Sequence, residues 1–315
     1  MFERLPIPTP FQVGDVNAYL AGRTLIDPGP DSDETWDALT AALAERDLSP
    51  GDVERVLITH PHPDHFGLAA RLREAGASVL ASPACADIVG DFAGRLDYEQ
   101  EFFVPFFRRH GLDESTAETV VELPEAYLPY APDCAVDREL TGGDTVTVAD
   151  RELSVLDVAG HAAGELAFAY DGADGEVAVV GDQVLPDITP NPLLQPPPSE
   201  RQDRPRVLPA FNRSLDRLAD REFDRLLPGH REEIGAPTAR IEEIRASHEQ
   251  RTENVATLVD GPTTAVEVMQ GLFGDLPATE LFPGMSEAVG HLDVLVERGR
   301  VTRRADEEWI AYEPA

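Results

Sequence analysis

The feature that most constrains the fold is a run of three histidines and an aspartate within six residues. The segment 53–59 (VERVLIT) has the apolar, β-branched character of a buried strand, and His60-Pro61-His62-Pro63-Asp64-His65 follows it directly. Neutral imidazole and carboxylate are usual ligands of zinc-like cations. Because the run leaves the end of a strand, its side chains can turn toward one point. The run therefore predicts a metal site at a strand end.

Three further ligand-type residues also follow strand-like segments. They are His161 after 152–158, Asp182 after 176–180 and His230 after 223–227. A glycine stands directly before each of them, which permits a tight turn of the backbone. We expect these three side chains to join the first cluster at one edge of a sheet.

Strand-like and helix-like segments alternate through the first 235 residues, which favours a layered fold of helices and sheets. The expected strands are 18–26, 53–59, 78–81, 145–148, 152–158, 166–170 and 176–180, and the expected helices are 33–45 and 69–75. After residue 235, a long charged helix, two shorter helical patterns and a hairpin over 299–312 follow the order of a winged-helix module. The predicted domains are 1–235, with an insertion at 96–132, and 236–315.

Taken in order, these segments resemble the signatures of metallo-β-lactamase superfamily hydrolases, including the hydroxyacylglutathione hydrolase branch. Asp27 matches the first signature, the 60–65 run the second, and the other three ligand-type residues the rest. The resemblance implies an α+β fold, a four-layer αββα metallo-β-lactamase sandwich, with a small C-terminal winged-helix-like domain. Glu165 stands near the position where many members of that branch have another histidine, a difference expected to lie away from the metal ligands.

The resemblance also implies a centre of two divalent ions, with zinc the first choice and iron or manganese left open. His60, His62 and His161 would hold the first ion, and Asp64, His65 and His230 the second. Asp182 would bridge both ions, and Asp27 would orient the ligands from behind. Asp64, Asp182 and Asp27 are thus the carboxylates expected to take part in catalysis.

The expected activity is hydrolysis of small acyl substrates, esters or thioesters. Two cations that share a hydroxide lower its pKa toward about 7, and they stabilise the charge that develops during its attack. A metal-dependent nuclease of the same fold is the alternative. A binding protein without activity is disfavoured, because buried carboxylates and imidazoles gather at a cost unless a cation pairs with them.

The segment 96–132 contains four phenylalanines, Phe102, Phe103, Phe106 and Phe107, next to His110. Aromatic residues at helical spacing indicate core packing, and a wall that closes over the substrate is the alternative. His248 is expected to be structural and His291 to belong to a core.

The net charge of the chain indicates which classes of partner it can bind. It has 59 acidic and 26 basic residues, a net charge of −33, and all of its basic residues are arginines. This charge disfavours nucleic acid and anionic membranes and fits a small-molecule substrate. The N-terminus lacks a signal-peptide pattern, and no apolar run is long enough to span a membrane. We therefore expect a cytoplasmic protein from a halophilic source, with a homodimer left open.

Thermal stability is predicted to rise with salt concentration. The 59 acidic side chains repel one another, and the Debye length falls from about 10 Å at 0.1 M to about 3 Å at 1 M salt. The midpoint of thermal unfolding, followed by circular dichroism between 0.1 M and 3 M KCl, should increase. A midpoint that is independent of salt would contradict the halophilic interpretation.

Overall fold

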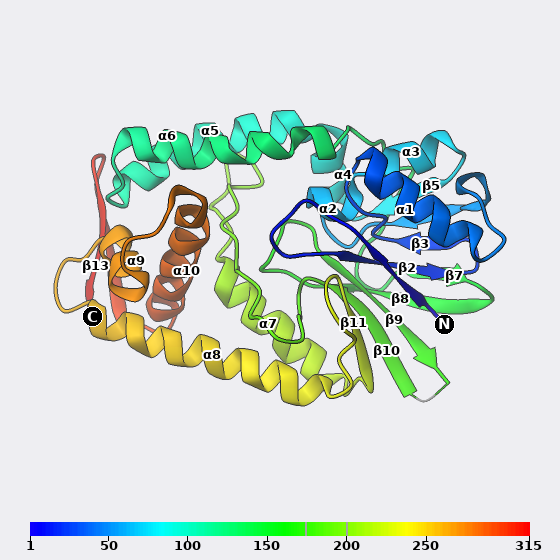
Figure 1. Ribbon diagram of the computed structural model, residues 1–315. Helices are drawn as coiled ribbons and strands as arrows, with labels where there is room; N and C mark the ends of the chain where they lie inside the picture. Colours follow the sequence, from blue (N-terminus) through cyan, green and yellow to red (C-terminus); the bar gives the residue numbers. More distant parts are fainter. Residues whose placement is uncertain (174, 200) are drawn as a thin grey trace. The chain divides into compact units, whose positions relative to one another are not determined.

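The computed structural model describes residues 1–173, 175–199 and 201–315 (Figure 1). The chain forms two compact units, each assembled from three separate segments. Unit 1 comprises Met1–Ala93, Ala126–Pro190 and Arg217–Ile241, and unit 2 comprises Gly94–Glu125, Asn191–Asp216 and Glu242–Ala315. The segment Asn191–Asp216 belongs to unit 2, although it was predicted to lie in the first domain, 1–235. The chain therefore passes between the units more often than the predicted domains 1–235 and 236–315 imply.

The first sheet of unit 1 has six strands in the order in which they follow along the chain. They are β1 (Glu3–Ile7), β2 (Val16–Ala21), β3 (Thr24–Ile26), β4 (Arg55–Leu57), β5 (Ser78–Ala81) and β6 (Arg138–Glu139). Strands β1 to β3 are antiparallel and β3 to β6 are parallel. The single strand predicted over 18–26 is wrong, because the chain reverses at Gly22, whose φ of 58° suits a tight turn.

The second sheet of unit 1 has five strands in the order β11-β10-β9-β8-β7. They are β7 (Thr145–Val148), β8 (Arg151–Asp157), β9 (Leu166–Gly172), β10 (Gly175–Gly181) and β11 (Arg225–Pro228). One buried apolar cluster takes Tyr19 and Leu57 from the first sheet and Phe168 and Val179 from the second. The two sheets therefore pack face to face around a shared core, which confirms the predicted sandwich of sheets with flanking helices.

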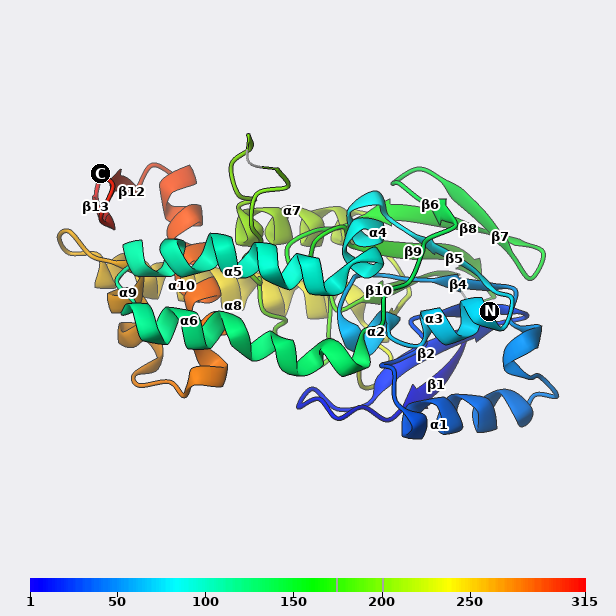
Figure 2. The same ribbon diagram turned by 90° about the horizontal axis from the view of Figure 1, so that it is seen from above.

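The helices of unit 1 are short and connect the strands of the first sheet. They are α1 (Asp33–Ala44), α2 (Pro63–Phe66), α3 (Ala69–Glu74) and α4 (Pro83–Gly90), with a 3₁₀ turn at Pro50–Asp52. The Ser32 side chain accepts a hydrogen bond from the Thr35 amide and caps α1, whose Leu39 and Leu43 are fully buried. Figures 1 and 2 show α1 and α3 on the outer side of the first sheet. These helices form the parallel crossovers that bring strand ends to one edge.

Unit 2 is built mainly from helices and ends in a hairpin. Its elements are α5 (Phe92–Arg109), α6 (Glu114–Glu122), α7 (Val207–Asp220), α8 (Pro237–Leu258), α9 (Ala265–Phe273), α10 (Ala278–Glu297), β12 (Val301–Ala305) and β13 (Ile310–Pro314). The first residues of α5 and α8 and the last residues of α7 belong to unit 1, and the 3₁₀ helix Leu123–Tyr130 spans the boundary between the two units along the chain. The three C-terminal helices and the hairpin follow one another in the predicted order. No helix of the described residues is both long and apolar enough to cross a membrane.

The phenylalanines of α5 belong to the core of unit 2. Phe103 and Phe107 are fully buried, their rings stack at 5.3 Å, and both contact the ring of Phe282 edge-on. The alternative of a wall over the substrate is therefore wrong for these two residues. His110 and His291 are fully buried in the same unit, in agreement with a structural role for His291.

Replacement of Phe103 by alanine should destabilise the fold, because it leaves a cavity in this core. We expect the free energy of unfolding to fall by about 3–5 kcal/mol in denaturant titrations. Phe273→Ala is the matched control, since Phe273 is 37% exposed and its loss should change stability little. An F103A variant that unfolds like the wild type but loses activity would contradict the core role and support contact of Phe103 with the substrate.

Candidate metal centre

The run 60–65 is shaped by its two prolines. Strand β4 ends at Leu57, and Pro63 is the first residue of α2, where its fixed φ suits the start of a helix. His62 precedes α2, and the His65 amide donates to the His62 carbonyl at 2.9 Å. Asp64 and His65 therefore lie in the first helical turn, while His60 and His62 lie on the extended chain before it. One short segment thus supplies ligand-type side chains from two directions.

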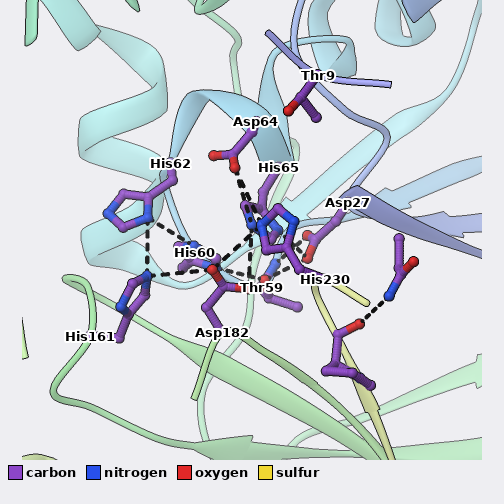
Figure 3. A network of polar contacts seen from close by, with 12 residues as sticks. Thr9, Asp27, Thr59, His60, His62, Asp64, His65, His161, Asp182 and His230 are labelled. Carbon is purple, nitrogen blue, oxygen red and sulfur yellow. Dashed lines mark hydrogen bonds and ion pairs between the residues drawn. The ribbon is translucent and has the colours of Figure 1, made fainter. Parts of the chain in front are cut away.

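The remaining predicted ligands come from the second sheet and meet this segment in unit 1 (Figure 3). His161 follows β8, Asp182 follows β10 directly, and His230 lies two residues beyond β11. All seven predicted ligands converge in Figure 3, with Asp182 between the side chains of the two predicted groups.

The first predicted group is compact. His62 Nδ1 lies 3.0 Å from His60 Nε2 and 3.2 Å from His161 Nε2. The three ligand nitrogens lie within 4.8 Å of one another, close enough for one cation to contact all three. The structure therefore brings these histidines together as predicted.

The second predicted group has one carboxylate, Asp64, and the predicted bridge Asp182 lies beside it. His230 Nε2 lies 3.3 Å from Asp64 Oδ2, and Asp64, His65 and His230 form a second cluster of ligand atoms. Asp182 lies 3.6 Å from His65 Nε2 and 3.5 Å from His230 Nε2. It also lies 3.7 Å from His161 Nε2, a member of the first group. Asp182 thus occupies the position that a bridging carboxylate requires.

Asp27 lies behind the ligands and is held in a strained backbone conformation with a φ of 51°. Its carboxylate accepts from the Thr59 amide at 2.8 Å and from the Thr59 hydroxyl at 2.6 Å. His65 Nδ1 lies 3.0 Å from Asp27 Oδ2, which directs His65 Nε2 toward the other ligands.

Sequence reasoning missed the role of Thr59. Its hydroxyl lies 2.9 Å from His60 Nδ1 and donates to Asp27, so it connects Asp27 to a ligand of the first group, while Asp27 itself contacts His65 of the second. The only signal is its place directly before the histidine run.

Two glycines let the ligand loops approach closely. A Cβ on Gly229 would lie 2.3 Å from Asp182 Oδ1 and 2.7 Å from His65 Cε1. A Cβ on Gly181 would lie 2.7 Å from the Thr59 hydroxyl, and Gly181 has a φ of 51°. Both contacts are too short for any other residue, so the glycines before Asp182 and His230 are geometric requirements of the site.

The donor set fits bound divalent cations. Among the described residues, the buried atoms that lack a hydrogen-bond partner include His65 Nε2, His230 Nε2 and Asp182 Oδ1. Buried polar atoms without a partner are costly and therefore rare. All three face the centre of the cluster, where a cation would contact them.

The electrostatics of the two groups differ. Burial and the neighbouring imidazoles lower the pKa of His62 to about 3, and the pKa of His60 falls well below its usual value for the same reasons. Burial opposes the charged form of His65 as well, but the carboxylates of Asp182, Asp64 and Asp27 raise its pKa to about 10. Burial thus favours the uncharged form of His60 and His62, whereas the carboxylates around His65 favour its charged form.

Glu165 does not lie away from the ligands, which corrects the prediction made from its sequence position. The side chain is buried, and its Oε2 accepts from the His161 amide at 3.2 Å. Burial raises the pKa of this carboxyl to about 8, although backbone donors of the same turn partly compensate. Glu165 therefore supports the turn that presents a predicted ligand.

Fold and site together define a metal-dependent hydrolase, and comparison with known proteins gives its family. The model of the metallo-beta-lactamase superfamily matches residues 12–230, and that of the metallo-beta-lactamase-like C-terminal domain matches 252–315. The chain belongs to the metallo-beta-lactamase superfamily.

Individual relatives agree with this assignment. A probable metallo-hydrolase of Bacillus subtilis is 32% identical over 302 residues, which cover 94% of this chain and 92% of that protein. A solved metallo-beta-lactamase family protein from Thermus thermophilus is 31% identical with a TM-score of 0.80, and the match covers 100% of this chain and 98% of that one. A hydroxyacylglutathione hydrolase of Hyphomonas neptunium is 27% identical over 165 residues, 52% of this chain and 44% of that protein. The hydroxyacylglutathione hydrolase branch therefore receives only weak support.

Gly229→Ala should weaken metal binding, because the added Cβ would displace Asp182 and His65. We expect the zinc retained after dialysis against a weak chelator to fall, and hydrolysis to fall by orders of magnitude. Gly235→Ala is the matched control, since its Cβ would meet no described heavy atom within 4 Å. Equal zinc retention and activity in both variants would contradict the geometry of the site.

Proposed function

We propose that the protein hydrolyses small esters or thioesters at a centre of two divalent ions, with zinc the first choice. The observation that supports this most directly is the position of Asp182, which lies within 3.7 Å of ring nitrogens from both ligand groups. When bound, such ions lower the pKa of water and polarise a carbonyl group, which is the chemistry that acyl hydrolysis needs.

The residues of the chain prepare the site for that chemistry. Burial lowers the pKa of His60 and of His62, which favours rings that can offer lone pairs without first losing a proton. Asp27 orients His65 from behind and, with its side chain 1% exposed, cannot itself reach a substrate. Asp64 is the most exposed of the three carboxylates, at 13%, so it is the one placed to meet water or substrate.

An aromatic cluster offers a surface for an apolar acyl group. The ring of Phe11, in the loop between β1 and β2, contacts Tyr127 and Tyr130 edge-on at 5.2 Å and 5.4 Å. Tyr127 is 43% exposed, and the other two are half-buried. Exposed aromatic rings bind apolar groups by burying large areas of surface. This cluster replaces the buried phenylalanines of α5 as the candidate acyl-binding surface.

Both sides of this aromatic cluster are tied to the metal centre. The loop of Phe11 ends at Asp15, whose carbonyl lies 2.8 Å from His230 Nδ1, and Thr9 of the same loop lies on the Asp64 side in Figure 3. The Tyr130 carbonyl accepts from the Asp31 amide and lies against Gly67, which ends helix α2. These contacts link the backbone on both sides of the cluster to the segments that carry His65 and His230.

The alternative of a nuclease receives less support from the C-terminal arginines. Arg298, Arg300 and Arg304 pair with Glu249, Glu253 and Glu313 in unit 2. Arginines that already face carboxylates are poorly placed to neutralise a phosphate backbone. The segment from residue 236 onward also has seven arginines against fifteen acidic residues.

A comparison of substrates tests the proposal. In high salt with zinc present, the wild type should hydrolyse aromatic and medium-chain acyl thioesters and leave a labelled single-stranded RNA intact. Phe11→Ala should lower kcat/KM for the apolar acyl groups by about tenfold and for an acetyl thioester much less, because it removes contact area with the acyl chain. Liquid chromatography of the products measures both reactions.

Two controls make the comparison specific. Phe273→Ala removes a more exposed phenylalanine of unit 2 and should change neither substrate preference nor rate. Asp182→Ala is the inactive control. Cleavage of RNA that depends on Arg300 and Arg303 and is insensitive to Phe11→Ala would support the nuclease instead.

A further inference from the structure

His230 lies in a segment that does not hold itself in place. Strand β11 ends at Pro228, two residues before it, and Arg231 directly after it has a φ of 67°. The left-handed region is unfavourable for a residue with a side chain, and it persists only where the surroundings enforce it. The orientation of His230 must therefore come from contacts with other parts of unit 1.

Two side chains of β2 supply those contacts. The Tyr19 hydroxyl donates to the Pro228 carbonyl at 2.7 Å. Asn17 Nδ2 donates to the Pro228 carbonyl at 2.9 Å and to the Arg231 carbonyl at 2.7 Å. Tyr19 and Asn17 are 1% and 2% exposed, so these bonds form where water cannot replace them.

The backbone of β2 completes the arrangement. The Asn17 amide donates to the Gly229 carbonyl at 2.7 Å, and Val16 forms an isolated bridge with His230. His230 Nδ1 lies 2.8 Å from the Asp15 carbonyl, an oxygen that can only accept, so Nδ1 carries the proton. This leaves His230 Nε2 directed at Asp64 and Asp182, 3.3 Å and 3.5 Å away.

These contacts connect the two sheets at the site, because β2 belongs to the first sheet and β11 to the second. Each carbonyl on either side of His230 is thereby held from the opposite sheet. The Pro228 carbonyl has two side-chain donors, so loss of the Tyr19 hydroxyl leaves Asn17 as its partner. Loss of that hydroxyl should therefore loosen the His230 segment without leaving a buried carbonyl unsatisfied.

We propose that Asn17 and Tyr19 are positioning residues that hold His230 for the ion it shares with Asp64 and His65. Neither side chain touches that ion or the substrate; both act through the backbone of the segment 228–231. The assignment rests on the proposed centre of two ions. It predicts that removal of these side chains weakens the binding of one ion. Binding of the ion held by His60, His62 and His161 should stay unchanged.

Tyr19→Phe tests this assignment because it removes one hydroxyl and leaves the buried ring. The metal-free full chain is titrated with Zn²⁺ in competition with a chromophoric chelator, and its unfolding is measured in parallel. We expect the dissociation constant of one zinc ion to rise about tenfold, that of the other to stay unchanged, and metal-free Tm to change little. Tyr170→Phe is the matched control, since Tyr170 is a buried tyrosine of the same core, and it should leave both constants unchanged.

Asn17→Ser is the second variant. It should weaken the binding of the same ion more strongly than Tyr19→Phe does, because Asn17 holds carbonyls on both sides of His230. Unchanged binding of two ions by both variants would overturn the positioning role and leave the two-ion centre intact. An equal rise in the dissociation constants of both ions, together with a lower metal-free Tm, would also overturn it, since general destabilisation would produce that result. A wild type that binds fewer than two ions would overturn the proposed centre and this assignment with it.

Discussion

The structure of unit 1 depends on the burial of carboxylates and imidazoles at one point. Asp27 and Asp182 are buried together with His60, His65, His161 and His230. An isolated charge in such a place costs far more than any single contact returns, unless opposite charge and hydrogen bonds compensate. Asp27 meets this requirement through Thr59 and His65, whereas Asp182 faces imidazoles without a hydrogen bond to its Oδ1. The centre therefore requires positive charge beyond what the protein supplies.

The sandwich serves this requirement by bringing strand ends together. Strands β4, β8, β10 and β11 each lead into a predicted ligand, and glycines at two of these turns let the loops approach within contact distance. The short side chain of Thr59 and the strained backbone of Asp27 connect the first and second groups from behind. Cross-sheet bonds from β2 then fix the segment of His230, so the site and the packing of the two sheets are coupled.

The sequence alone predicted which ligand-type side chains the fold brings together, and it predicted most strands near them. Imidazole and carboxylate groups are metal ligands whatever their distant partners in the fold. The run 60–65 places four of them within six residues, so the sequence alone indicates a metal site. The aromatic residues of α5 were harder to interpret. Helical spacing shows that one face of the helix is apolar, but it does not show which element packs against that face. Their partner is Phe282, far away in the sequence. Likewise, nothing in the sequence joins Phe11 to Tyr127 and Tyr130, since only the fold brings a loop and a 3₁₀ helix together.

The central claim is that seven side chains hold two ions with Asp182 between them. The most direct measurement is anomalous diffraction from crystals grown with zinc in high salt, recorded on both sides of the zinc absorption edge. The account predicts two peaks, one contacted by His60, His62 and His161 and the other by Asp64, His65 and His230, with a carboxylate oxygen of Asp182 beside each. A single peak at full occupancy, or peaks that Asp182 does not contact, would contradict it.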